Sequence, residues 1–303
     1  MELWVPITLA AAFSQNIRSA LQKHFSTSLG ATGATFLRFA YGFPFALIYL
    51  AVLNQGFGMA LPGPNGSFLA YALTGGLLQI TATFLLVSLF AFKNFAVGTA
   101  YSKTEPIQAA VFGLVFLGES VTLLGAAAIL LGTLGVIAIS LARSSKGLKS
   151  LLESLLGRPA LIGLASGACF GASAVCYRGA SLSLDGPTFL MQAGLTLAVV
   201  TVFQTAVMAL WMIWRDRQQL LASLAAWRTA VWVGLSGVAG SACWFTAMTL
   251  QNVAYVRMLG QVELVFSIIA SVAFFREKVT PRELLGCVLI GSGILLLLAP
   301  RVG

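Results

Sequence analysis

Two stretches of the chain follow one pattern: NFAVGTAYSKTEPIQAAVFGLVFLGESVT (94–122) and NVAYVRMLGQVELVFSIIASVAFFREKVT (252–280). Each is long and apolar enough to cross a membrane, since a spanning helix needs about 20 mostly apolar residues. Each nevertheless carries charged residues inside the apolar run, with a carboxylate at the same position in both, Glu105 and Glu263. The residues shared at an offset of 158 are Asn94, Ala96, Glu105, Phe116, Glu119, Val121 and Thr122, matching Asn252, Ala254, Glu263, Phe274, Glu277, Val279 and Thr280. The pattern indicates an internal repeat.

A second pair of stretches supports the repeat. SLGATGATFL (28–37) resembles SLSLDGPTFL (181–190) at six positions, now at an offset of 153. The longest polar segment, ARSSKGLKSLLESLLGR, divides the chain almost in half. We therefore predict a first repeat over 1–142, a basic linker over 143–158 and a second repeat over 159–303.

The composition places the whole chain in the membrane. Of its 303 residues 58% are hydrophobic and 9% are charged, whereas a soluble domain carries about 25% charged residues; the mean hydropathy is +0.92. We predict an all-α integral membrane protein with ten transmembrane helices. The expected spans are 3–20, 33–53, 68–91, 94–116, 121–142, 159–180, 187–214, 229–250, 252–275 and 281–299.

Each half contains five expected spans, which is an odd number. The second half must then enter the membrane from the opposite side to the first, so we predict two inverted five-helix repeats. Inverted repeats are typical of secondary transporters, whose substrate sites lie near the bilayer midplane.

Ten spans arranged as five plus five resemble the EamA type of the drug/metabolite transporter superfamily. The motifs that carry the resemblance are FLGESVT (116–122), FFREKVT (274–280), LLGAAAILLGTLGV (123–136) and LLGCVLIGSGILLL (284–297). The resemblance implies export of amino acids, nucleotide sugars, other metabolites or toxic compounds, with helices 1–4 and 6–9 around a central cavity and helices 5 and 10 outside it. One departure from the small multidrug relatives is that the first helix has no membrane-embedded glutamate, which puts their proton antiport in doubt here.

The charged residues inside the spans are the expected substrate-binding groups. An ionisable side chain at the bilayer centre costs at least about 2.5–3.5 kcal/mol, so these groups must face protein or water. Pro106 is expected to kink the fourth span beside Lys103. The predicted contacts to substrate are Asn16, Arg38, Tyr101, Lys103, Glu105, Gln108, Trp244, Arg257, Gln261 and Glu263.

The charged members of this set are Arg38, Lys103, Glu105, Arg257 and Glu263, and their sum is positive. Because guanidinium groups pair with carboxylates and phosphates, we expect an anionic or zwitterionic metabolite such as an amino acid. The alternatives are efflux of amphipathic drugs or toxic compounds, and a channel or receptor without a transport cycle whose charges form only structural ion pairs.

Other classes of function are not expected. Neither a nucleotide-binding loop nor an enzyme motif is present, and the four cysteines and single histidine lack metal-ligand spacing, so we predict no catalysis, cofactor or metal. The expected partners are a small-molecule substrate and the lipid bilayer, and not nucleic acid. Proton coupling through Glu105 or Glu263 and passive facilitation both stay open, as do a monomer and a homodimer.

The net charge of +9 arises mostly from loops. Twelve of the cations fall on one side of the expected topology, and the positive-inside rule assigns that side to the cytoplasm. We therefore expect a multi-pass protein of the bacterial inner membrane with both termini on the non-cytoplasmic side.

Overall fold

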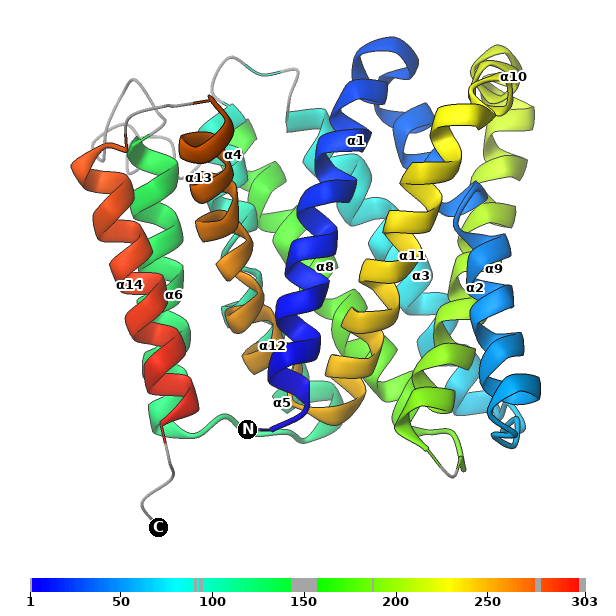
Figure 1. Ribbon diagram of the computed structural model, residues 1–303, viewed down its shortest axis with the longest axis horizontal. Coiled ribbons are helices and arrows are strands. Elements are labelled where there is room, and N and C mark those ends of the chain that lie inside the picture. The colour runs from blue at the N-terminus through cyan, green and yellow to red at the C-terminus, as the bar shows by residue number, and fades with distance from the viewer. Residues whose placement is uncertain are drawn as a thin grey trace. The chain divides into compact units, whose positions relative to one another are not determined.

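The computed structural model describes residues 2–89, 92, 95–142, 157–186, 188–275 and 279–299, and every regular element in this part of the chain is helical (Figure 1). The first half contains α1 (Trp4–Ala40), α2 (Phe43–Ala51), the π-helix η1 (Val52–Gly56), α3 (Gly66–Ser88), α4 (Phe95–Ser102), α5 (Glu105–Leu117) and α6 (Leu123–Ala142). The second half contains α8 (Arg158–Leu182), α9 (Phe189–Arg215), α10 (Arg217–Ala225), α11 (Trp227–Leu250), α12 (Val253–Gly260), α13 (Val262–Phe275) and α14 (Pro281–Leu298). The predicted all-α fold class is confirmed.

Several helices are long and apolar enough to cross a bilayer, as an integral multi-pass membrane protein requires. Within the described residues these segments are Thr32–Gly56, Gly66–Ser88, Leu123–Ser140, Arg158–Leu182, Phe189–Arg215, Trp227–Leu250 and Pro281–Leu298. Three of the ten expected spans are absent from this set: the first, 3–20, and the fourth and ninth, each of which is divided into two short helices. The number of crossings therefore stays a prediction.

The first expected span ended too early, whereas the second, 33–53, corresponds to the segment Thr32–Gly56. Residues 21–29, expected as part of a loop, continue the first helix, and the chain bends at Gly30, whose φ of 64° is accessible to glycine without strain. The short helix α10 was also missed, because its sequence RQQLLASLA lacks the long apolar run that marked the spans.

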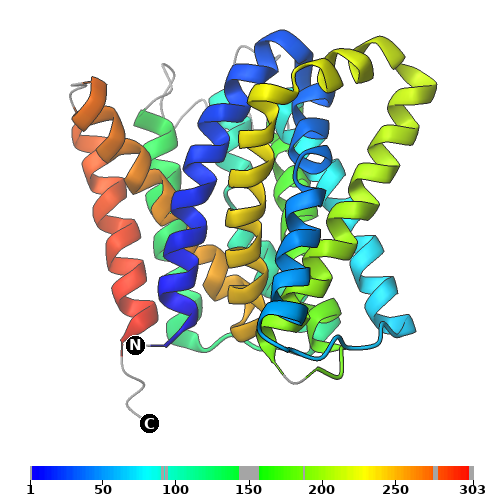
Figure 2. The same cartoon turned by 45° about the vertical axis from the view of Figure 1, so that its right-hand side comes forward.

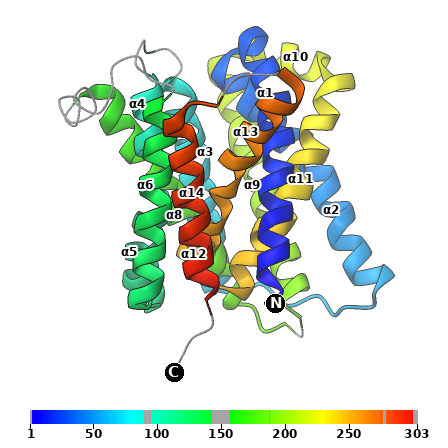
Figure 3. The same ribbon diagram turned by 60° about the vertical axis from the view of Figure 1, so that its left-hand side comes forward.

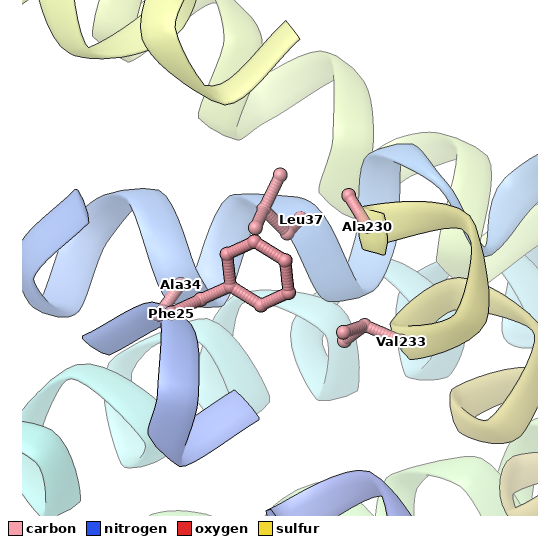
Figure 4. Packing of buried hydrophobic residues seen from close by; sticks show 5 residues of the cluster. All are labelled: Phe25, Ala34, Leu37, Ala230 and Val233. Atoms are coloured by element: carbon pink, nitrogen blue, oxygen red, sulfur yellow. The ribbon is translucent and has the colours of Figure 1, made fainter. Parts of the chain in front are cut away.

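The chain divides into two compact units, and each contains segments from both halves of the sequence. The first unit comprises Met1–Ile80 and Cys176–Gln251. In it α1 packs along α11 and α2 packs on α9 (Figures 1 and 2). In Figure 4 the Phe25 ring lies beside Leu37, and Ala230 and Val233 of α11 complete this apolar cluster together with Ala34.

The second unit comprises Thr81–Val175 and Asn252–Gly303. Its most extensive contact joins α6 of the first half to α14 of the second, and the two helices run side by side in Figures 1 and 3. Val136 and Ile139 of α6 meet Ile290 of α14 and Ile268 of α13 in a buried cluster. In the same unit α12 packs against α5 and α6, which brings the two interrupted spans together.

Candidate functional site

Two interrupted helices form the centre of the polar site in the second unit. Between α4 and α5 the backbone tightens into a turn, in which Lys103 N donates to Ala100 O (3.2 Å) and Thr104 N donates to Tyr101 O (3.1 Å). Pro106 follows in the first turn of α5, where its missing N–H removes no helical bond. The interruption expected near Pro106 is therefore present, as a break rather than a kink.

The second interruption lies between α12 and α13, at Gln261. Here Gln261 N donates to Met258 O (3.1 Å), again a bond between residues three apart. A Gln261 side-chain hydrogen bond, from Nε2 to Lys103 O (3.4 Å), joins this break to the first. Irregular backbone at membrane depth is tolerated only where protein or water surrounds it. The hydrogen bond from Gln261 meets this requirement for the carbonyl of Lys103.

Two ion pairs cross between the broken helices. Lys103, in the first break, pairs with Glu263 of α13. Arg257, in the last turn of α12, pairs with Glu105 of α5, with 2.9 Å between Nε and Oε1. Each pair thus joins a cation from one repeat to a carboxylate from the other, and the charges of these four residues cancel.

Helix polarity contributes to this arrangement. Glu105 and Glu263 both lie in the first turn of a helix, where the helix dipole favours negative charge. Arg257 lies in the last turn of α12, where the dipole favours positive charge. Breaking a span into two helices therefore creates termini that suit charged groups inside the membrane.

Two amides beside the ion pairs offer acceptor oxygens. Gln108 Nε2 donates to Thr104 Oγ1 (3.0 Å), which leaves the amide oxygen directed elsewhere. The buried Oε1 atoms of Gln108 and Gln261 receive no hydrogen bond from any described residue. A buried acceptor without a donor is costly, so a donor from water or from a ligand would stabilise these oxygens.

Tyr101 lies apart from the ion pairs. Its side chain is 8% exposed and packs with Ala160, Ile137 and Leu164. The break at Lys103 separates Tyr101, in α4, from Glu105 and Gln108, in α5.

The other predicted residues belong to the first unit. Arg38 lines a small pocket, with its guanidinium carbon 5.2 Å from the centre of the Phe39 ring. Trp244 is 6% exposed and donates from Nε1 to Gln15 Oε1 (3.1 Å), so Gln15 rather than the partly buried Asn16 meets the indole.

A buried polar network in this unit consists of residues that were not among the predicted ones. Tyr177 Oη lies 3.0 Å from Gln79 Oε1 and 3.0 Å from Gly75 O, and can donate to either. Gln204 Nε2 donates to Gln79 Oε1 (2.8 Å), and both glutamines line the pocket beside Arg38. Glutamines inside apolar spans are the signal that would have revealed them.

Arg18, near the end of the first expected span, is a further cation of this unit and is buried, with 8% exposed. The stems of Arg18 and Arg38 both lie against Gly237 of α11, at 3.5 and 3.7 Å from where a Cβ would stand. Because α1 continues beyond residue 20, Arg18 is inside the helix rather than at its end.

Comparison with known proteins identifies the family. The model of the EamA-like transporter family matches the chain twice, over residues 2–141 and 157–299. A protein known from its crystal structure superposes with a TM-score of 0.72 over 99% of this chain and 97% of that chain; at 18% identity the likeness shows a shared fold alone. No curated protein sequence matches the chain. The chain belongs to the EamA-like transporter family of membrane proteins, part of the drug/metabolite transporter superfamily.

Proposed function

We propose that this chain is a secondary transporter that exports a small zwitterionic or anionic metabolite, such as an amino acid, by alternating access. In this proposal ten spans form two inverted five-helix repeats in a bacterial inner membrane, and both repeats contribute to a midplane site. Helices 1–4 and 6–9 of the ten would surround the cavity, and both termini would lie outside the cytoplasm.

The observation that carries the proposal is the crossed pairing at the two helix breaks. Lys103 with Glu263, and Arg257 with Glu105, each unite residues of the two repeats. Discontinuous helices with charged groups at their termini form the substrate and ion sites of many secondary transporters. Pairs that join the repeats can separate when the repeats move, which would link substrate binding to a change of access.

The charge balance favours a zwitterion. A molecule with one carboxylate and one ammonium group can replace an ion pair without leaving an uncompensated charge in the membrane. Arg257 offers a planar guanidinium to a carboxylate, and Glu105 or Glu263 offers an acceptor to an ammonium group. The acceptor oxygens of Gln108 and Gln261 suit the remaining N–H bonds. An α-amino acid fits these requirements with the fewest atoms.

The first unit adds positive charge inside the membrane. Arg18 and Arg38 lie within α1, whereas the acidic residues of this unit, Glu2, Asp185 and Asp216, lie outside the helices. The pocket beside Arg38 also presents the polar side chains of the Gln79 network. This distribution supports a substrate with a carboxylate over a cationic drug.

The substrate class is tested by thermal-shift measurements on the purified protein. Amino acids, organic acids, nucleotides and cationic drugs would be compared. We expect zwitterionic amino acids to raise the melting temperature most, because a ligand that binds only the folded state stabilises it. Stabilisation by cationic drugs alone would favour drug efflux instead.

The site is tested with Glu263→Gln and Arg257→Ala, measured by flux of the stabilising compound into proteoliposomes. We expect each variant to lose transport while remaining folded in the membrane. Asp185→Asn and Arg282→Ala are matched controls, since both residues are exposed and lie outside the pairs. Normal transport by both site variants would show that the ion pairs serve structure alone.

A further inference from the structure

A basic and aromatic surface surrounds α10, the short helix between α9 and α11. Its nine residues extend about 14 Å at 1.5 Å per residue, about half the thickness of the bilayer core. Figure 2 shows this yellow helix running across the ends of α9 and α11. A helix of this length and position cannot span the membrane and is placed to lie in its interface.

One side of α10 packs against α1 and against Tyr41, the residue that follows α1. Gln219 Nε2 donates to Leu29 O (2.6 Å), a carbonyl beside the bend at Gly30. Tyr41 Oη donates to Leu224 O (2.9 Å), and Leu220 is buried on the same side. These contacts determine which face of α10 is directed outward.

Three exposed arginines lie in and next to α10: Arg215 ends α9, Arg217 begins α10 and Arg228 is in the first turn of α11. None of them forms an ion pair with a carboxylate in the described part of the chain. Asp216, the nearest acidic residue, accepts from Gln219 N (3.0 Å) as the N-cap of α10. The segment 214–228 therefore has a net charge of +2.

Exposed indoles accompany these arginines. Trp214 is 82% exposed and Trp227 is 56% exposed, and the Arg228 guanidinium lies 5.6 Å from the centre of the Trp227 ring. Leu221 of α10 is 57% exposed. Tryptophan is enriched at membrane interfaces, and arginine binds phosphate through parallel hydrogen bonds.

We infer that the residues 214–228 form a binding surface for the headgroups of anionic phospholipids, here named the α10 surface. Arginines would contact lipid phosphates, while the indoles and Leu221 enter the boundary between headgroups and acyl chains. The combination decides between partners: an acidic soluble protein would complement the arginines but would leave the large apolar side chains without a matching apolar phase. The inference is independent of the transported substrate.

The test uses the full chain in nanodiscs and measures quenching of tryptophan fluorescence by brominated lipid. Brominated phosphatidylglycerol and brominated phosphatidylcholine would be compared at equal mole fraction. We expect stronger quenching by the anionic lipid, because each arginine near the membrane surface contributes about 1 kcal/mol, or about fivefold, to attraction of anionic lipid. Trp214→Phe with Trp227→Phe should remove most of the difference.

The decisive variant is Arg217→Gln with Arg228→Gln, which should reduce the preference for the anionic lipid about fivefold or more. Arg158→Gln with Arg282→Gln is the matched control, because it removes two exposed cations elsewhere. We expect the tryptophan fluorescence of the control variant to be quenched by the two lipids as in the original protein. Melting curves in phosphatidylcholine nanodiscs would confirm that all variants are folded.

Three results would overturn the inference. One is equal quenching of the original protein by the two lipids. Another is an equal loss of the preference for phosphatidylglycerol in both arginine double variants, which would show that net charge alone causes the effect. The third is a decrease in this quenching when poly-glutamate is added, together with equal quenching by the two lipids. This result would assign the surface to an acidic polypeptide.

Discussion

Glu263 illustrates how one residue connects sequence, structure and proposed function. Its matching position with Glu105 marked it in the sequence, and it lies in the first turn of α13 with 8% of its surface exposed. The sequence predicted that these carboxylates and cations matter, but could not predict which would pair. That choice depends on how α12 packs on α5, a contact between residues about 150 positions apart.

A charge reversal separates the structural role of the Lys103–Glu263 pair from its proposed role in transport. Lys103→Glu alone should destabilise the protein by about 3–5 kcal/mol, because it leaves like charges facing each other in a buried site. Adding Glu263→Lys should recover most of the stability, measured by thermal unfolding, but not transport, because the new lysine lies where a substrate ammonium would bind. Recovery of both stability and transport would show that the pair only holds the helices together.

The buried network in the first unit gives a prediction about stability. Tyr177→Phe should lower the unfolding free energy by about 1–3 kcal/mol, because it removes a hydroxyl that contacts the buried Gln79 and Gln204. Tyr71→Phe is the control, since Tyr71 forms no hydrogen bond within the described chain. Denaturant titration in detergent would compare them, and equal stabilities would contradict the role given to the network.

At the scale of elements, the glycine-spaced helices α6 and α14 show what a sequence pattern can predict. Small residues at regular spacing are typical of closely packed membrane helices, and Gly135 and Gly286 lie against each other's backbone. The bend at Gly30 falls within residues 21–32, which were expected as a loop between the first two spans, but the helix on its N-terminal side was not predicted to extend so far. The breaks in the two charged spans were only partly predictable: Pro106 marked one, whereas the other is marked only by Gly260, and a single glycine inside an apolar run does not by itself predict a break.

Substitution at Gly286 tests the packing of α6 on α14. A Cβ there would lie 2.4 Å from Ile139 Cγ1 and 2.6 Å from Gly135 O, so Gly286→Ala should destabilise the protein by about 1–3 kcal/mol. Gly291→Ala is a control on the same helix, because nothing lies within 4 Å of its new methyl group. Thermal unfolding of both variants would decide, and a neutral Gly286→Ala would mean that the helices are less closely packed.

At the scale of the whole molecule, the apolar composition and the repeated motifs were sufficient to predict an all-helical membrane protein and its family. They were not sufficient to predict how the chain divides in space. Both compact units mix segments of the two repeats, because α6 packs with α14 and α1 packs with α11, in pairs that join the two halves of the sequence. Such pairing depends on contacts between segments that are distant in the sequence, and the local pattern of apolar residues does not indicate which of them pack together.

Orientation is a prediction at this scale. The excess of cations on one side should direct both termini away from the cytoplasm. Single cysteines would be introduced at Ser67 and at Gln218, after replacement of the four native cysteines, and labelled in intact cells with a reagent that does not cross the membrane. We expect Ser67, between the second and third spans, to be labelled in intact cells, because that side is non-cytoplasmic in this topology. Gln218, in α10, should stay unlabelled until the cells are opened. Labelling of Gln218 in intact cells would reverse the orientation.

The central claim is that the paired breaks hold a substrate that the protein carries from one side of the membrane to the other. Counterflow in proteoliposomes tests it most directly, with the amino acid that gives the largest thermal shift. A high internal concentration of unlabelled amino acid should drive transient accumulation of labelled amino acid by the original protein, and Glu263→Gln should abolish this accumulation. Equilibration without accumulation by the original protein, or unchanged accumulation by Glu263→Gln, would contradict the claim.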